Sequence, residues 1–129
     1  MIVDTSALLA ILFAEPEREE LLSVLTSARS LSMSAATYVE AGIVADCRNE
    51  PVVSRRMDEL ITTLQVEILP LTAGQALIAR QAYRDFGRGS GHPARLSYGD
   101  CFSYALAKDT DEPLLWKGDD FGHTDLRRG

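Results

Sequence analysis

Four acidic residues that are far apart in the chain lie where a parallel α/β protein carries its chemistry. Each comes just after an apolar run with strand character or near the start of a helix. Because the carboxyl ends of parallel strands meet at one edge of the sheet, we expect these positions to gather there. The four residues are Asp4, Glu40, Asp100 and Asp119.

Carboxylates gathered in this way require a counter-charge. Within a few ångströms of one another they repel, and without compensation some of them would take up protons. Lys117 is the only basic residue in the short motifs that carry them. A bound divalent cation supplies the missing charge, and an all-oxygen set without His or Cys favours Mg²⁺, or Mn²⁺ in its place, over zinc.

A site of this kind suits the hydrolysis of phosphodiester bonds. A bound ion polarises the scissile phosphate and helps to generate hydroxide from water, so no covalent nucleophile is needed. Thr5 and Ser6 follow Asp4 directly but have no histidine in their motif, so we interpret them as hydrogen-bond partners of Asp4 or of the substrate. His92 and His123 are expected in solvated loops.

Each acid also has a purely structural explanation. The first could cap the helix that begins behind it. Thr37 with Glu40 matches the capping-box pattern, in which a hydroxyl and a carboxylate satisfy N-terminal N–H groups reciprocally. Ser97 with Asp100 matches the same pattern, and Asp119 could be a turn residue that bonds its own backbone. Taken singly these explanations suffice, and it is the shared sheet edge that favours a common site.

Strands and helices are predicted to alternate along the chain. The expected strands cover residues 1–3, 31–34, 66–71 and 113–116, with a short edge strand over 125–127. The expected helices cover residues 7–12, 15–28, 35–48, 53–64, 72–86 and 97–106. In the helix over 72–86, the residues expected to be buried are Ala76, Ala79, Tyr83 and Phe86. Alternation without a hairpin signal predicts a mainly parallel sheet of four or five strands, covered by helices on both faces.

The composition bounds the class of protein. A chain of 129 residues can form one domain with a hydrophobic core and is too short for two of ordinary size, so we expect a single domain over 1–129. The net charge of −6 argues against general attraction to a polyanion without excluding RNA, because a metal ion neutralises carboxylates. No apolar run approaches a membrane span, and we expect a cytoplasmic protein. Cys47 and Cys101 lack disulfide or zinc spacing and are expected in the core.

Residues 87–93 contain three alternating glycines and form the one segment expected to be flexible. The segment lacks the Lys-Ser/Thr pair of a P-loop, and no strand precedes it. Besides a plain linker, it could present Arg88 to a phosphate.

The four acidic motifs resemble those of a known family when they are taken in order. The matching blocks are residues 1–7 (MIVDTSA), 34–41 (SAATYVEA), 92–107 (HPARLSYGDCFSYALA) and 114–121 (LLWKGDDF). In sequence they resemble PIN-domain proteins of the VapC type, the toxins of bacterial toxin–antitoxin pairs, over essentially the whole chain. One departure is Lys117, where members of the family commonly have Thr.

The resemblance implies a Mg²⁺-dependent ribonuclease with a three-layer α/β/α sandwich fold. Asp4 and Asp100 match the firmest metal-ligand positions, and Glu40 and Asp119 complete the acidic set, with Asp120 as the alternative fourth acid. The family is often dimeric, and a cognate antitoxin blocks its activity. The resemblance therefore implies RNA as substrate, an antitoxin as partner and a homodimer.

A second hypothesis is a receiver-like signalling domain that accepts a phosphoryl group beside a bound metal. Such domains also place acids at the strand ends of a parallel sheet. The spacing of the acids argues against it, because no acidic pair follows one early strand and the third strand ends in Pro70 without an acid. The target RNA and the number of ions stay open.

Overall fold

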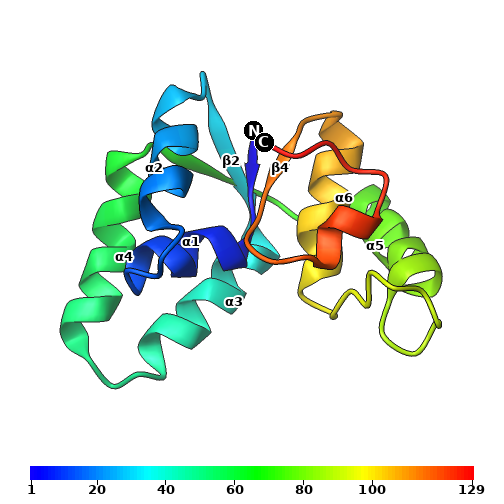
Figure 1. Cartoon of the computed structure of the whole chain (residues 1–129), viewed down its shortest axis with the longest axis horizontal. Coiled ribbons are helices and arrows are strands. Elements are labelled where there is room, and N and C mark those ends of the chain that lie inside the picture. Colours follow the sequence, from blue (N-terminus) through cyan, green and yellow to red (C-terminus); the bar gives the residue numbers. More distant parts are fainter.

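The structure is a computed structural model that describes all 129 residues. Its elements in chain order are β1 (Ile2–Val3), α1 (Thr5–Leu12), α2 (Arg18–Ser27), β2 (Leu31–Ser34), α3 (Ala35–Asp46), α4 (Pro51–Thr63), β3 (Val66–Leu69), α5 (Ala73–Phe86), α6 (Asp100–Thr110), β4 (Leu114–Leu115) and the 3₁₀ helix η1 (Asp120–His123). They form the predicted sandwich, with α1 to α4 on one side of the strands and α5 and α6 on the other (Figure 1).

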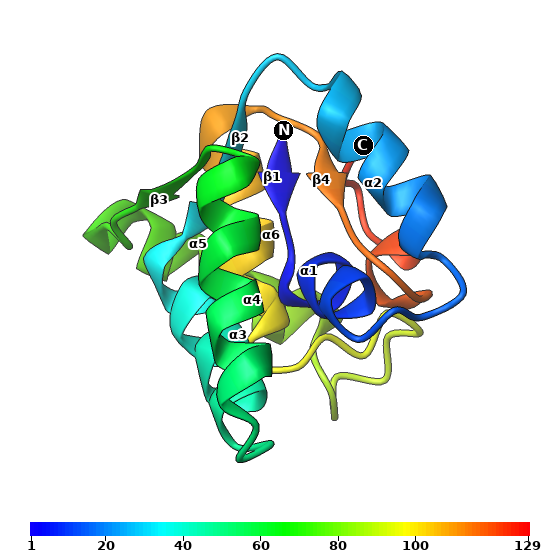
Figure 2. The same ribbon diagram turned by 90° about the vertical axis from the view of Figure 1, so that its left-hand side faces the viewer.

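The sheet has four strands in the order β3-β2-β1-β4, and every pair is parallel. β1 therefore lies inside the sheet, between β2 and β4, with α1 beginning at its carboxyl end (Figure 2). The edge strand predicted over residues 125–127 is wrong. Residues 125–127 follow η1 without regular structure, and the chain then meets the sheet in a single bridge between Leu114 and Arg128.

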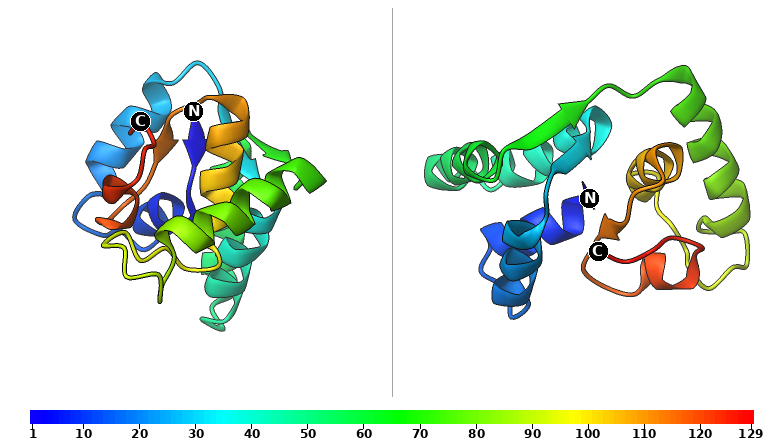
Figure 3. Two further views of the ribbon diagram at one scale, coloured as in Figure 1. Left: turned by 90° about the vertical axis from the view of Figure 1, so that its right-hand side faces the viewer. Right: turned by 90° about the horizontal axis from the view of Figure 1, so that it is seen from above.

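Two hydrophobic cores lie on the two faces of this sheet, because successive strand residues point to opposite sides. In β1, Ile2 belongs to the core under α5 and α6, whereas Val3 belongs to the core under α1 to α4. Leu114 and Leu115 in β4 divide in the same way. Seen from above, the strands run between the two groups of helices (Figure 3).

Helix α6 contributes more buried residues than any other helix. Residues all around it are buried, including Cys101, Ser103 and Leu106, because α6 packs against α5, α3 and the sheet. In α5 the predicted buried face is partly wrong. Ala79 is buried, but Ala76 and Tyr83 are exposed. The helix turns Gln75 and Ala82 inward instead, so its contact face is rotated from the prediction.

The glycine-rich segment is held by backbone hydrogen bonds. The Arg88 N–H donates to the Leu96 carbonyl and the Leu96 N–H donates to the Phe86 carbonyl.

The prediction that both cysteines are core residues is half right, since Cys101 is buried and Cys47 is exposed. None of the helices combines the length and apolar character needed to span a bilayer.

Candidate active site

Asp4 follows β1 at the carboxyl edge of the sheet, and the pleat fixes its direction. Ile2 faces α6, so Asp4, two residues later, faces α6 as well. Its N–H donates to the Leu115 carbonyl of β4 at 3.0 Å, which continues the sheet pairing up to the carboxylate. Asp4 also caps α1, as predicted, by accepting from the Ser6 N–H.

The Asp4 carboxylate is buried and accepts three hydrogen bonds. Ser103 Oγ donates to Asp4 Oδ1 at 2.6 Å, and Ser6 donates to Asp4 Oδ2 from its Oγ at 2.7 Å and its N–H at 3.0 Å. The Lys117 N–H in turn donates to Ser6 Oγ. Burial nevertheless raises the pKa of Asp4, and the charge of Glu40 raises it further against these hydrogen bonds. The fold therefore buries a carboxylate whose ionised form a bound cation would stabilise.

Asp100 lies in the first turn of α6, beside Asp4. Its Oδ2 accepts from the Ser97 N–H at 2.8 Å and its own N–H donates to Ser97 Oγ at 3.2 Å, which confirms the predicted capping box. Burial raises the pKa of Asp100, and the charges of Asp4 and Asp120 act in the same direction. The charge of Asp4 thus opposes the ionisation of Asp100.

Glu40 reaches the same region from α3. Thr5 Oγ1 donates to Glu40 Oε1 at 2.6 Å, so the residue after Asp4 holds the second acid. The other side of the Glu40 carboxylate lies against Gly99, at a position that a Cβ at residue 99 would fill. Gly99 has ordinary helical dihedral angles, so the glycine is required by this close approach rather than by backbone conformation.

The predicted capping box of Thr37 and Glu40 is wrong. Ser34 caps α3, which leaves the Thr37 hydroxyl free to reach Ser103 Oγ at 3.1 Å. Glu40 is correspondingly released from backbone capping and accepts from Thr5. The hydroxyl and carboxylate of this motif therefore both serve the site.

The two acids after β4 occupy different places. Asp120, in the first turn of η1, is the one whose charge acts on Asp100. Asp119 lines a hollow beside α2, together with Glu17, Glu20 and Arg128. The charges of Glu40, Asp4 and Asp120 thus act within one group of acids that includes Asp100, and Asp119 lines the hollow beside α2.

Lys117 does not neutralise this region. Its ammonium group pairs with Glu15 and, at 3.7 Å, with Glu17. The Glu15 hydrogen bond raises the pKa of Lys117, so the positive charge of this lysine is paired with acids of the loop before α2. The acids at the sheet edge keep their unbalanced negative charge.

The chemistry of the donor set fits a hard divalent cation, although the side chains do not form a closed cage. No three His, Cys, Asp or Glu side chains in the structure lie close enough together to ligate one ion. Mg²⁺ is bound in proteins through one or two carboxylates and retains several waters, so a closed cage is not required. Asp4 and Asp100 are the carboxylates whose burial and mutual repulsion such an ion would relieve.

The sequence did not predict a functional role for three residues of the site: Thr37, Gly99 and Ser103. A signal for Ser103 was present, because it lies one helical turn after Asp100 in a run that is otherwise apolar or aromatic. Gly99 carried no signal of its own, since only the approach of Glu40 from another helix shows why a side chain is excluded there.

The two histidines lie outside this cluster. His92 is half-buried rather than solvated, because its ring packs edge-on against Phe86 and its Nδ1 accepts from the Ala94 N–H. His123 is exposed in η1, as predicted. No histidine is therefore within the group of acids.

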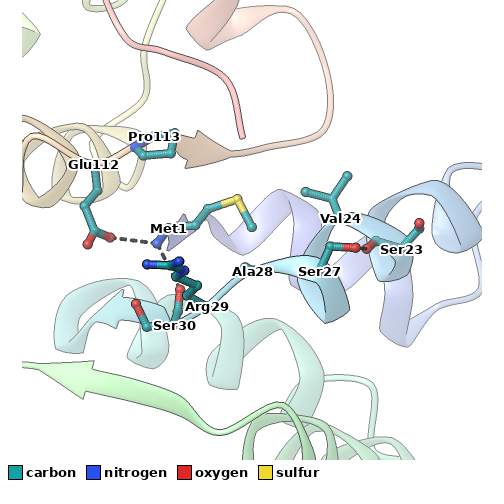
Figure 4. A pocket seen from close by; sticks show the side chains of 9 residues that line it. All are labelled: Met1, Ser23, Val24, Ser27, Ala28, Arg29, Ser30, Glu112 and Pro113. Atoms are coloured by element: carbon teal, nitrogen blue, oxygen red, sulfur yellow. Dashed lines mark hydrogen bonds and ion pairs between the residues drawn. The ribbon is translucent and has the colours of Figure 1, made fainter.

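Two other hollows lie outside the group of acids. One lies at the opposite, amino-terminal edge of the sheet, where the Met1 amine pairs with Glu112 and donates to the Ser30 carbonyl (Figure 4). The other adjoins the acids and is mostly apolar. Its lining residues are Ala36, Val39, Glu40, Ile43, Val44, Leu71, Tyr98, Gly99 and Phe102.

Comparisons with known proteins agree with this architecture. Residues 1–126 match the model of the family described as the PIN domain. The chain is 56% identical over 128 residues to ribonuclease VapC28 of Mycobacterium tuberculosis, and the match covers 99% of this chain and 96% of that protein.

Solved structures share the fold at low sequence identity. VapC20 of Mycobacterium tuberculosis, titled a sarcin-ricin loop cleaving toxin, gives a TM-score of 0.77 at 16% identity, covering 99% of this chain and 97% of that chain. A chain of a toxin-antitoxin complex from Klebsiella pneumoniae gives 0.67 at 19% identity, covering 93% and 88%. These two likenesses concern the fold alone.

Proposed function

The chain belongs to the PIN-domain family and is a ribonuclease of the VapC type, and from this premise we propose that it is a Mg²⁺-dependent endoribonuclease, the toxin of a toxin–antitoxin pair. The observation that carries the proposal is the buried Asp4 carboxylate, with Asp100 and Glu40 beside it and no basic side chain to balance them. The family membership favours this function over the receiver-like alternative. We place its action in the cytoplasm, where RNA is available.

Asp4 and Asp100 would hold the ion, and Glu40 and Asp120 would complete the acidic set directly or through water. When bound, Mg²⁺ polarises the scissile phosphate and lowers the pKa of water, and Mn²⁺ can replace it. Glu40 is held through Oε1 by Thr5 and lies through Oε2 against Gly99, and we propose that this fixed carboxylate accepts a proton from the attacking water. The water oxygen forms the new bond to phosphorus, the bond to the leaving oxygen breaks, and that oxygen takes up a proton.

Cleavage of a mixed cellular RNA pool tests the proposal. Purified protein is incubated with Mg²⁺, with Mn²⁺ or with EDTA, beside the Asp100→Asn variant. We expect cleavage with either metal and none with EDTA or with the variant, because Asp100 is one of the two principal ligands. Cleavage that is unchanged in EDTA and in Asp100→Asn, with the fold verified by circular dichroism, would contradict it.

The identity of the fourth acid can be tested by comparing variants of the two neighbouring residues Asp119 and Asp120. We propose Asp120 rather than Asp119, because the charge of Asp120 acts on Asp100 while Asp119 lines the hollow beside α2. Asp120→Asn should lower the cleavage rate by about 10-fold or more, the usual scale for a group that supports a metal site. Asp119→Asn should stay within about twofold of the wild type on the same scale. The reverse order of the two variants would return the assignment to Asp119.

An antitoxin and a second copy of the chain are the proposed protein partners. The apolar hollow beside Glu40 contains a single charged residue in its lining, and Ile43 and Tyr98 there are 58% and 78% exposed. Depletion of charge and exposed aromatic surface are features of interface centres. We assign this face to a homodimer, and the antitoxin would then act on a dimer whose sites adjoin the interface.

A further inference from the structure

A chain of buried hydroxyl groups connects the three elements that carry the acids. Thr37 on α3 lies 3.1 Å from Ser103 on α6, oxygen to oxygen, and Ser103 Oγ lies 2.6 Å from Asp4 Oδ1 after β1. The three residues are almost inaccessible, with 1%, 0% and 2% of their surfaces exposed. Bulk water therefore cannot substitute for any of these hydrogen bonds.

The direction of the hydrogen bonds is fixed by their chemistry. An ionised Asp4 can only accept, so Ser103 must donate its single hydroxyl proton to Oδ1. Ser103 Oγ can then only accept from Thr37, which becomes the donor of that pair. The order of donation is therefore Thr37 to Ser103 to Asp4.

The positions of the two hydroxyl groups tie this chain to the other acids. Thr37 lies three residues before Glu40 on α3, and Ser103 lies three residues after Asp100 on α6. Each hydroxyl is thus one helical turn from an acid on the same side of its helix. A contact between Thr37 and Ser103 sets the separation of the two helices at the level of the site.

Lone-pair counting shows which atom of Asp4 is left for a ligand. Oδ2 accepts twice from Ser6, so both of its lone-pair directions are used. Oδ1 accepts only from Ser103 and retains one direction. The oxygen that remains available to a cation is the same oxygen that Ser103 orients.

We propose that Thr37 and Ser103 are positioning residues that orient Asp4 Oδ1 for metal binding through this hydroxyl chain. The inference rests on the proposed function, since it assigns Asp4 as a metal ligand. In this role neither hydroxyl is itself a metal ligand. Their effect is to hold one carboxylate oxygen in place and to fix the spacing of α3 and α6 around it.

The test is the affinity of the purified protein for Mn²⁺ alone, measured by electron paramagnetic resonance and by calorimetry. Thr37→Val removes the hydroxyl group and keeps the side-chain shape, whereas Thr37→Ser keeps the hydroxyl group and removes the methyl group. We expect Mn²⁺ binding to weaken about 10- to 100-fold in Thr37→Val and in Ser103→Ala, the range for partners that orient a metal ligand. Thr37→Ser should restore binding to near the wild-type value.

A combined variant and a surface control sharpen the result. Thr37→Val added to Ser103→Ala should cause no further loss, because Thr37 acts only through Ser103. Ser54→Ala removes a surface hydroxyl that bonds Asp46 on the far part of α3, and it should leave Mn²⁺ binding unchanged. Urea unfolding of every variant without metal reports stability separately from affinity.

Two outcomes would overturn the inference. Wild-type Mn²⁺ affinity in Thr37→Val and Ser103→Ala would show that the hydroxyl groups do not orient the ligand. Binding by Thr37→Ser as weak as by Thr37→Val would show that packing, not the hydroxyl, is what matters. Either outcome, with normal binding by the wild-type chain, contradicts the inference alone, whereas a wild-type chain that bound no Mn²⁺ would contradict the proposed function itself.

Discussion

The Asp4 carboxylate is placed where its charge is costly without a cation. Burial raises its pKa above the value of 3.8 expected for the unfolded chain, so the fold favours the protonated acid. A raised pKa contributes stability below about pH 4 that is lost as the pH rises through the folded-state value. Ionisation of Asp4 in the metal-free protein is therefore unfavourable.

Replacing Asp4 with Asn should stabilise the metal-free protein. We expect the free energy of unfolding at pH 7 to rise by about 1 kcal/mol, the usual scale for relief of a strained functional site. The gain should shrink as the pH is lowered toward 4, because the wild-type acid then becomes protonated. Urea unfolding from pH 4 to pH 8 in EDTA measures this difference.

The same comparison with saturating Mg²⁺ serves as its control. An ion at 100 times its dissociation constant stabilises the wild type by about 2.7 kcal/mol, and Asp4→Asn should lose this increment. A variant that is less stable than the wild type in EDTA at pH 7 would contradict the interpretation of Asp4 as a strained metal ligand.

Gly99 makes room for Glu40, and its replacement tests that contact. A Cβ at this position would overlap the Glu40 carboxylate, so Gly99→Ala should displace the acid. We expect RNA cleavage to fall about 100-fold, as for a catalytic group moved by about 1 Å.

Gly42→Ala on α3 is the matched control for Gly99→Ala. A Cβ there would lie 3.9 Å from Met57 Cε, which is an ordinary contact, and Ala favours the helix by up to about 1 kcal/mol. It should keep full cleavage activity and raise the urea midpoint. Equal activity of the two variants would show that Glu40 does not need its observed position.

At the scale of elements, the junction between α5 and the following loop depends on a second close approach. A Cβ at Gly87 would collide with the Tyr83 carbonyl and ring, although the Gly87 dihedral angles suit any residue. Gly87→Ala should therefore lower the free energy of unfolding by about 1–3 kcal/mol, the range for overpacking. Chemical denaturation measures the loss.

Gly122→Ala provides the reference for that loss. No atom lies within 4 Å of a Cβ built at Gly122, so the substitution should change stability by less than about 0.5 kcal/mol. A Gly87→Ala protein as stable as Gly122→Ala would mean that the loop rearranges freely. In that case residues 87–93 would be the flexible linker that their composition suggested.

At the scale of the whole molecule, the apolar face beside Glu40 is expected to hold a second copy of the chain. Ile43→Lys places a charge on this face without touching either core, because Ile43 is 58% exposed. Light scattering coupled to gel filtration should show a dimer for the wild type and a monomer for the variant. The loss follows from burying an unpaired charge in an interface.

Val52→Lys is the control for this face. Val52 is similarly exposed, on α4 and outside the hollow, so the variant should remain dimeric. A wild-type protein that is monomeric at all concentrations would contradict the homodimer and leave the face to the antitoxin.

Much of this molecule was determined by the sequence alone. Apolar periodicity reflects burial directly, so it predicted the parallel strands, the six helices and the position of Asp4 at the carboxyl edge of the sheet. The capping box of Ser97 and Asp100 was also predicted, because its two partners lie within one turn. Local chemistry and periodicity are encoded in neighbouring residues, and the sequence displays them.

Only the tertiary structure decided the contacts between elements that are distant in the chain. Thr37 pairs with Ser103 rather than capping its own helix, Gly99 accommodates Glu40, and the charge of Asp120 acts on Asp100. The rotation of α5 and the single bridge at Arg128 in place of a fifth strand belong to the same class. Each depends on the distance and rotation between packed elements, and those are set by the whole core rather than by any short stretch of sequence.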